Sequence, residues 1–368
     1  MIKKSLFFII TAIVISGCAE KKKAEPAAEN EKTADEIISP FELNDNMMSF
    51  QWQSAIPLKA GEKIAQSFTY EGDLFAVTSK NLIFCLDRIT GELKFVKTLS
   101  EPGLPVSPPV IYDSRLYFSV GSQIVIVDPK EYKAQPQFRM DNPPVANLVI
   151  KQGYLYAALT DKRLRCYDLD DNMQVFSVVP DDQSGIQSFA VDANRAYIVS
   201  NDANVYGISR FEPVKYWANQ LLNGIPGDII VSENSVYVAG EDGMIYKINS
   251  SNGVTTWKAV LGTTIDKKVR IVDGMVMVET LSKGVYAISD ETGEVLWHCD
   301  GCRQLVSMYR DTMTLLTDDS LVVVKSSNGE IVKSVKVANP AGGVFNQADS
   351  MSYVYDYKGN ICCVDELK

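Results

Sequence analysis

Carboxylates are the side chains of this 368-residue chain that could most readily do acid–base chemistry, and three of them cluster in the stretch YAISDETGEVLW. Asp290, Glu291 and Glu294 surround a Thr-Gly turn between an alternating strand and a tryptophan. Two neighbouring carboxyl groups could act as general acid and general base. The alternative is that these acids belong to a polar turn in a structural unit. A structural unit of this kind is expected to recur along the chain, whereas a catalytic loop is not.

The stretch recurs in a constant register. The last residue of the strand before each turn serves as an anchor, and successive anchors are 36 to 41 residues apart. The eight anchors are Asp87, Asp128, Asp168, Ser209, Asn249, Ser289, Lys325 and Asp365. Four positions after each of the first seven anchors lies a turn residue, which is glycine in four repeats. Eight positions after each of these anchors lies a residue that is usually aromatic, and these seven residues are called the aromatic column. The column consists of Phe95, Pro136, Phe176, Trp217, Trp257, Trp297 and Lys333. The acids are therefore assigned to turns, and the column is expected to be buried.

Each repeat contains enough strand for a four-stranded antiparallel meander. Runs such as SVYVAGEDGMIYKIN and VRIVDGMVMV alternate or are continuously apolar, as half-buried or fully buried strands are. A period near 40 residues with four strands per unit is typical of a β-propeller. The sequence therefore predicts an all-β fold over residues 42–368, an eight-bladed β-propeller of four-stranded antiparallel blades.

The eighth repeat is incomplete, because the chain stops just after Asp365. The segment MMSFQWQSAIP, residues 47–57, lies outside the eight rows and carries Trp52. We expect this N-terminal strand to complete the eighth blade and close the ring, which would remove an open sheet edge. The alternative is an unpaired arm that happens to contain a tryptophan.

The N-terminus has the pattern of a secreted lipoprotein. MIKKSLFFIITAIVISGC has two lysines, an apolar run and small residues before a cysteine, which resembles the bacterial lipobox. Residues 1–17 are expected to be a signal peptide, and Cys18 is expected to be lipidated; the alternative is a plain signal peptide with an incidental cysteine. Residues 18–41 are charged and poor in large apolar side chains, which predicts a disordered tether. Ala19 after the lipidated cysteine favours the outer membrane, facing the periplasm.

The turn pattern, seen as NSSNGVTTW and SDETGEVLW, resembles the quinoprotein-type (PQQ-like) repeat and its tryptophan-docking motif over residues 74–368. Together with the lipoprotein pattern it resembles the BamB family of outer-membrane lipoproteins. The resemblance implies a non-catalytic scaffold without a cofactor that supports assembly and insertion of β-barrel outer-membrane proteins. Its implied partners are an Omp85/BamA-type barrel protein with its assembly complex, unfolded outer-membrane proteins, and the membrane through the lipid anchor.

Two other functions stay open. One is a PQQ- and calcium-dependent dehydrogenase, which would need inserted loops to build its pocket. The other is a carbohydrate- or small-ligand-binding propeller that uses the central channel. Nucleic acid is not expected as a partner. The chain has a formal charge of −10, and loss of Lys3 and Lys4 with the expected signal peptide would make it −12, whereas binding to the phosphate backbone favours positive charge.

The cysteines have different expected roles. Cys85, Cys166, Cys362 and Cys363 lie within predicted strands, where a cysteine usually acts as a small buried hydrophobe. Cys299 and Cys302 form a Cys-x-x-Cys turn in HCDGC, in a connector that is shorter than the others. They are candidates for a structural disulfide, with two free thiols as the alternative. A zinc site is disfavoured because two cysteines and one histidine lack a fourth ligand.

The connectors around the fourth blade could bind a partner. In such a meander the connectors between repeats share a rim with the turns between second and third strands. LLNGIPGD places Leu222 and Ile225 beside Asp228, and the preceding connector PDDQSG contains Asp181 and Asp182. Apolar residues in a polar loop suit a protein interface. The alternative is that the leucines finish a strand and pack inward. In the BamB family the partner-binding loops lie on these connectors, so the resemblance implies this surface but not its residues.

Overall fold

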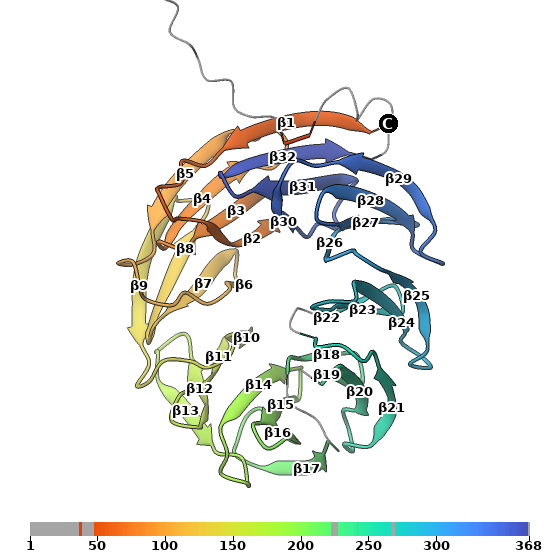
Figure 1. The fold of residues 1–368 in the computed structure, drawn as a ribbon. Coiled ribbons are helices and arrows are strands. Elements are labelled where there is room, and N and C mark those ends of the chain that lie inside the picture. The colour runs from red at the N-terminus through yellow and green to blue at the C-terminus, as the bar shows by residue number, and fades with distance from the viewer. Residues whose placement is uncertain (1–36, 39–47, 222–226, 241, 266–268, 367–368) are drawn as a thin grey trace, which may run out of the picture. The chain divides into compact units, whose positions relative to one another are not determined.

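The computed structural model describes residues 37–38, 48–221, 227–240, 242–265 and 269–366, all within one compact unit, Glu36–Lys368. Every regular element in this part of the chain is a β-strand, and the strands form eight four-stranded antiparallel sheets. Figure 1 shows the sheets as the blades of an eight-bladed β-propeller. The all-β fold class and the blade count predicted from the repeat are therefore confirmed.

The first four blades follow one another along the chain, each running from its innermost to its outermost strand. Blade 1 contains β2 (Ile64–Tyr70), β3 (Asp73–Thr78), β4 (Leu82–Asp87) and β5 (Leu93–Thr98). Blade 2 contains β6 (Val110–Tyr112), β7 (Arg115–Val120), β8 (Gln123–Asp128) and β9 (Lys133–Arg139). Blade 3 contains β10 (Val149–Lys151), β11 (Tyr154–Ala158), β12 (Leu164–Asp168) and β13 (Gln174–Val178). Blade 4 contains β14 (Ile186–Val191), β15 (Arg195–Ser200), β16 (Asn204–Ser209) and β17 (Lys215–Gln220).

The other four blades repeat the order, except that the last takes one strand from the N-terminus. Blade 5 contains β18 (Ile229–Ser232), β19 (Ser235–Ala239), β20 (Met244–Asn249) and β21 (Thr255–Val260). Blade 6 contains β22 (Val269–Val272), β23 (Met275–Glu279), β24 (Val285–Ser289) and β25 (Val295–Cys299). Blade 7 contains β26 (Gln304–Tyr309), β27 (Thr312–Leu316), β28 (Ser320–Lys325) and β29 (Ile331–Lys336). Blade 8 contains β30 (Pro340–Val344), β31 (Met351–Asp356), β32 (Asn360–Asp365) and β1 (Ser49–Ala55).

The ring is closed by the N-terminal strand, as predicted. Strand β1 pairs antiparallel with β32, so that Ser49 lies opposite Asp365 and Trp52 opposite Cys363. The innermost strands β2 and β30 also contact each other, which joins blade 1 to blade 8 (Figure 1). The outermost strand of blade 8 therefore comes from the opposite end of the described chain, and the sheet is not left with three strands.

The burial pattern of each strand follows its place in the blade. The second strands are apolar on both faces because a neighbouring blade covers each side, and β19 is buried at all but its first residue. The outermost strands are covered on one side only, and β21 exposes four of its six residues while burying Trp257 and Ala259. The apolar cores therefore lie between successive blades, each built from strands of two blades.

The tryptophans of the repeat dock each blade on the next. In four blades the indole N–H donates to the carbonyl oxygen of the residue after the next blade's anchor, over 2.7 to 3.1 Å. These pairs are Trp52 to Arg88, Trp217 to Ser250, Trp257 to Asp290 and Trp297 to Ser326. Each ring also covers the turn glycine of the next blade. A Cβ on Gly293, whose φ is +78°, would lie 2.7 Å from the ring of Trp257. The turn at Asp290 is thus a docking platform, and its glycine is required by both backbone conformation and contact.

Two blades depart from the aromatic column. Pro136 is exposed, so the expectation that it is buried is wrong. In blade 1 a bulge in β5 brings Phe95 opposite Cys85, whereas β9 has no bulge at that place, and Gln135 lies opposite Ile126. In blade 7 Lys333 replaces the tryptophan, and its Nζ donates to the Glu366 carbonyl oxygen over 2.8 Å. The lysine thus uses the acceptor position that the tryptophans use elsewhere.

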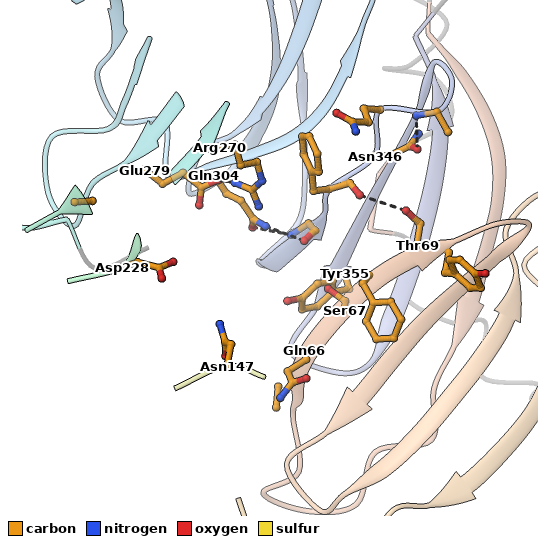
Figure 2. A pocket seen from close by; sticks show the side chains of 18 of the residues that line it. Gln66, Ser67, Thr69, Asn147, Asp228, Arg270, Glu279, Gln304, Asn346 and Tyr355 are labelled. Carbon is orange, nitrogen blue, oxygen red and sulfur yellow. Dashed lines mark hydrogen bonds and ion pairs between the residues drawn. The ribbon is translucent and has the colours of Figure 1, made fainter. Parts of the chain in front are cut away.

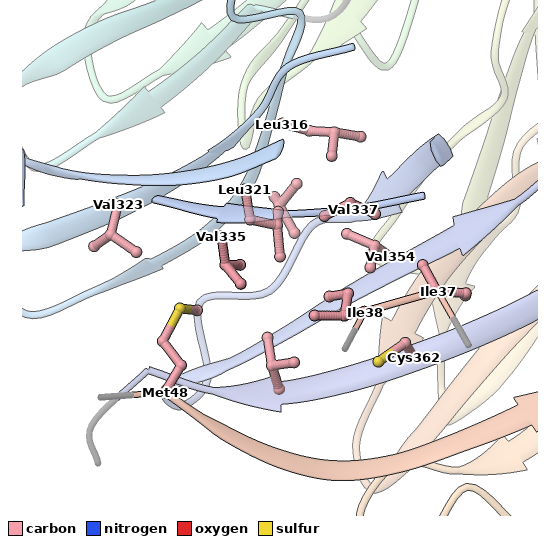
Figure 3. Close-up of a cluster of buried hydrophobic side chains, with 12 residues drawn as sticks. Ile37, Ile38, Met48, Leu316, Leu321, Val323, Val335, Val337, Val354 and Cys362 are labelled. Atoms are coloured by element: carbon pink, nitrogen blue, oxygen red, sulfur yellow. The ribbon is translucent and has the colours of Figure 1, made fainter. Parts of the chain in front are cut away.

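A short N-terminal segment fills the seam between blades 7 and 8. Ile37, Ile38 and Met48 are 1 to 2% exposed and pack among side chains of these two blades (Figure 3). The Ile37 amide donates to Gln53 Oε1 over 3.0 Å, and its carbonyl oxygen accepts from the Ala338 amide over 2.8 Å. The predicted tether extended to residue 41, and this boundary requires correction, because Ile37 and Ile38 are part of the core.

Candidate functional site

The innermost strands of the blades surround a central cavity of about 940 Å³. Its wall includes residues of β2, β14, β22, β26 and β30, together with residues from the connectors that lead into the inner strands. Figure 2 shows the side chains that line it, among them Gln66, Asn147, Asp228 and Gln304. The cavity and the connector rim both gather polar side chains from several blades.

A collar of polar residues, which was not predicted from the sequence, lines the cavity at one repeated position. The collar consists of Gln66, Asn147, Ser188, Asp228 and Gln304. Each stands 21 positions before the anchor of its own blade, as does Ser107 of blade 2. A polar residue at a constant offset, just where an inner strand begins, is the signal that could have revealed the collar. Strand alternation alone could not, because the inner strands are short and some are bulged.

Three collar residues connect neighbouring blades. Gln66 Nε2 donates to the Val106 carbonyl oxygen over 2.7 Å, and Ser188 Oγ donates to Gly227 over 2.6 Å. Gln304 donates to the Gly343 carbonyl oxygen over 2.8 Å and accepts from the Gly343 amide over 2.9 Å. In each pair the acceptor lies 39 or 40 residues further along the chain, one repeat away. These side chains hold the inner edges of successive blades together.

The charged groups of the cavity wall include two ion pairs. Arg270 Nη1 lies 2.7 Å from Glu279 Oε1, and that oxygen also accepts from the Leu305 amide over 3.0 Å. The guanidinium lies over the ring of Phe345, 4.6 Å from its centroid. In the second pair, Nη2 of the lining residue Arg88 lies 2.9 Å from Asp349 Oδ2. Each arginine is therefore neutralised by a carboxylate of the protein and oriented by it.

Asp182, one of the predicted partner-binding residues, organises its own loop. Its carboxylate accepts from Ser200 Oγ over 2.6 Å, from Asn204 Nδ2 over 2.7 Å and from the Ser184 amide over 3.0 Å. Burial alone would raise the pKa of Asp182, but these hydrogen bonds outweigh it and lower the pKa to about 2. The side chain therefore holds the connector between blades 3 and 4 in place, and its oxygens are engaged within the protein.

The remaining predicted partner residues have different surroundings. Asp181 is exposed and forms an ion pair with Lys215. Asp228 lines the central cavity, and its Oδ1 accepts from the Ile229 amide over 2.9 Å. Leu222 and Ile225 lie outside the described residues. Strand β17 ends at Gln220, and Leu221 directly after it is buried, which agrees with the inward packing of the alternative.

The cysteines fall into two groups in the structure. Cys299 and Cys302 are joined in a disulfide within the connector between blades 6 and 7, with their Cα atoms 5.5 Å apart. The other four described cysteines are free and buried. Burial raises the pKa of the Cys166 thiol to about 11 and that of the Cys362 thiol to about 12, so neither is a thiolate near neutral pH. Cys362 and its neighbour Cys363 pack into different cores on opposite faces of β32.

The described ranges contain neither a cluster of metal ligands nor a membrane-spanning helix. No group of three or more His, Cys, Asp or Glu side chains there is arranged to hold a metal ion. In the same part of the chain, no helix has the length and apolar character needed to span a bilayer. Cys18 and the expected signal peptide lie outside the described residues.

Comparisons with known proteins found one matching family model and solved structures of similar fold. Residues 211–365 match the family model described as outer membrane protein assembly factor BamB. The crystal structure of BamB from Moraxella catarrhalis superposes with a TM-score of 0.64 at 13% identity, covering 86% of this chain and 99% of that one. A computationally designed protein, Ika8, superposes with a TM-score of 0.66 at 12% identity, covering 83% and 96%. At these identities the superpositions show the fold alone. No curated protein sequence gave a significant match.

Proposed function

We propose that this BamB-like PQQ-repeat propeller is a non-catalytic scaffold that supports assembly and insertion of β-barrel outer-membrane proteins. In this role it binds an Omp85/BamA-type barrel protein and its assembly complex, and it helps to deliver unfolded outer-membrane proteins. Lipidation at Cys18 would anchor it to the outer membrane, facing the periplasm, with residues 19–36 as the tether.

The observation that carries the proposal is the match of residues 211–365 to the BamB family model. This range begins in the turn of blade 4 and extends through the four following blades. It contains three of the described tryptophan docking contacts, so the match rests on the repeat itself. A repeat identifies the fold more reliably than the function, because one fold can serve many functions. The proposed function is therefore tied to a particular surface that an experiment can alter.

The connector rim of blades 4 and 5 offers such a surface. Four aspartates on this rim are called the acidic arc. Asp181 and Asp228 lie on the connectors that precede β14 and β18, and Asp202 and Asp242 lie in the turns that join β15 to β16 and β19 to β20. Asp181, Asp202 and Asp228 are exposed, and Asp242 is half-buried. Connectors and these turns share one rim because the strands of each blade alternate in direction. A partner with a basic surface would be attracted to this arc and oriented by it.

Co-purification tests the proposal. The wild-type protein, extracted from envelopes in mild detergent, is expected to bring down the barrel protein. Reversing two exposed charges of the acidic arc with Asp181→Lys and Asp202→Lys should reduce recovery of the barrel protein at least severalfold. Raising the salt concentration should reduce recovery of the wild-type complex in the same direction.

The matched control reverses two exposed charges on the opposite rim, with Asp170→Lys and Glu212→Lys in the turns that follow the anchors of blades 3 and 4. This control should recover the barrel protein as the wild type does. If no barrel protein accompanies the wild type, the scaffold role is refuted. If both double variants behave alike, the acidic arc is not the docking surface.

A further inference from the structure

We infer that the mouth of the central cavity binds an extended, uncharged polypeptide segment through the amide side chains of its collar and the residues beside them. The inference rests on the proposed function for the source of the segment, an unfolded outer-membrane protein, but its chemistry is argued from the cavity alone.

The mouth has hydrogen-bonding capacity that the described part of the protein does not use. Asn147 and Gln187 line the cavity, are exposed to it, and make no side-chain hydrogen bond to another described residue. Gln66 uses its Nε2 on the neighbouring blade, but its Oε1 is buried without a donor. A primary amide offers two donors and an acceptor, and a buried acceptor without a donor carries a free-energy cost. Exposed amides therefore face the cavity from blades 3 and 4, and Gln66 of blade 1 adds an unpaired acceptor that is buried in the wall.

The charges of the wall favour an uncharged ligand. Arg270 is held by Glu279, and Arg88 is held by Asp349. A charged ligand would have to compete with one of these pairs, or leave one partner unpaired in a partly buried site, which is strongly unfavourable. Two further carboxylates line the wall: Glu71 accepts from the Tyr70 hydroxyl over 2.9 Å, and Asp228 accepts from the Ile229 amide over 2.9 Å. The other polar side chains of the wall are amides and hydroxyls, whose natural counterparts are uncharged polar groups.

The aromatic side chains of the wall do not form a sugar platform. Phe345 is covered by the guanidinium of Arg270, and Phe68 stacks on Phe75 with ring centroids 5.0 Å apart. Tyr355 packs against the core between blades 8 and 1, and Tyr70 packs against the core between blades 1 and 2. Carbohydrate recognition by stacking needs an open ring face, and these rings are already in contact with protein groups. A peptide group needs no ring: it presents one donor and one acceptor, the same pair that an amide side chain presents in return.

The size of the cavity agrees with this ligand class. Its volume of about 940 Å³ is near the upper end of the range of roughly 300–1,000 Å³ found for ligand sites. An extended strand rises about 3.3 Å per residue, so a segment of a few residues can reach amides on several blades at once.

Fluorescence anisotropy with a defined probe tests the inference. The probe is an eight-residue peptide of Ser, Thr and Gly with blocked ends and one dye, titrated with the full purified propeller in the absence of any barrel protein. The double variant Asn147→Leu with Gln187→Leu removes both amides while nearly keeping side-chain size. It should bind the peptide at least about tenfold more weakly, since each hydrogen bond typically changes affinity by a factor of about 2 to 13.

The matched control changes two exposed amides on outer strands, with Gln135→Leu and Gln174→Leu on β9 and β13. Thermal melting shows that both double variants fold. The control should bind the peptide as the wild type does. Equal affinity in all three proteins, or no binding to the wild type, would overturn the inference, as would binding of an uncharged oligosaccharide in place of the peptide.

The two proposals can fail separately. Asn147→Leu with Gln187→Leu should leave co-purification of the barrel protein unchanged, because neither residue belongs to the acidic arc. Absent peptide binding with intact co-purification would remove the cavity inference and leave the scaffold role. Intact peptide binding without co-purification would do the opposite.

Discussion

Replacing Trp257 by alanine removes the contact that docks blade 5 on blade 6. The indole is 9% exposed, packs near Tyr237 and covers Gly293, and its N–H donates to the Asp290 carbonyl oxygen over 2.8 Å. A buried tryptophan changed to alanine costs about 3 to 5 kcal/mol of unfolding free energy. The acceptor is not left unpaired, because Lys247 Nζ also donates to it over 2.9 Å. We therefore expect a loss in the lower part of that range, about 3 to 4 kcal/mol.

The reciprocal change at Gly293 separates contact from backbone strain. An alanine there would place its Cβ 2.7 Å from the Trp257 ring, at a φ of +78°. The left-handed backbone costs roughly 1–2 kcal/mol for a residue with a Cβ, and the clash adds to it. In the background of Trp257→Ala the clash disappears and only the backbone cost remains. A double-mutant cycle should therefore give a coupling energy of about 1 to 2 kcal/mol between the two positions.

Urea unfolding followed by circular dichroism measures all four proteins of this cycle, and the slope with urea shows whether unfolding stays cooperative. A loss below about 1 kcal/mol for Trp257→Ala would mean that the blades are held together elsewhere. Additive effects of the two changes would refute the claim that tryptophan and glycine act as one docking unit.

Three further predictions concern the closure, one loop and the disulfide. Deleting residues 42–57 removes β1 and Trp52, so the melting temperature of the whole unit should fall; an unchanged melting curve would contradict closure by this strand. The pKa of Asp182 is lowered to about 2, so its contribution to stability is complete above the ordinary value near 3.8 and disappears as the pH falls through about 2. Asp182→Asn should therefore be less stable than wild type near neutral pH, with the difference shrinking between about pH 4 and pH 2 in denaturant titrations. Reducing the Cys299–Cys302 disulfide should lower stability by about 2 kcal/mol at most, because the closed loop is short, and thermal melting with a dithiol reductant measures it.

The repeat made most of the fold predictable from the sequence. The spacing of anchors gave the number of blades, and the turn glycines with their tryptophans gave the contacts between blades. Trp52 was recognisable as the missing member of the column, because the chain ends before the eighth blade is complete. These features are local and repeated, so each copy supports the assignment of the others.

Features that occur once were not predictable. Ile37 and Ile38 form an apolar pair in a charged segment, and nothing local indicates that they fill the seam at which Lys333 replaces a tryptophan. The prediction that Pro136 is buried was wrong, because a bulge, and not spacing alone, decides which residue of an outer strand faces the next blade. For the partner surface, spacing placed Asp182 on a connector but could not show that Ser200 and Asn204 engage its carboxylate.

The pairing of β1 with β32 has a consequence for how this protein reaches its native state. Ser49 meets Asp365, a partner made about 316 residues later, so this contact has nearly the largest sequence separation that the unit allows. Contacts of such separation slow folding, and they cannot form while the chain is still emerging from a ribosome or a translocation pore. Until then β1 has no strand to pair with. Trp52 also lacks the ring of Tyr353 and the rest of the core in which it is buried in the native protein. The ring can therefore close only after the last blade has been delivered, and the interval before closure is when an unpaired edge most needs protection from aggregation.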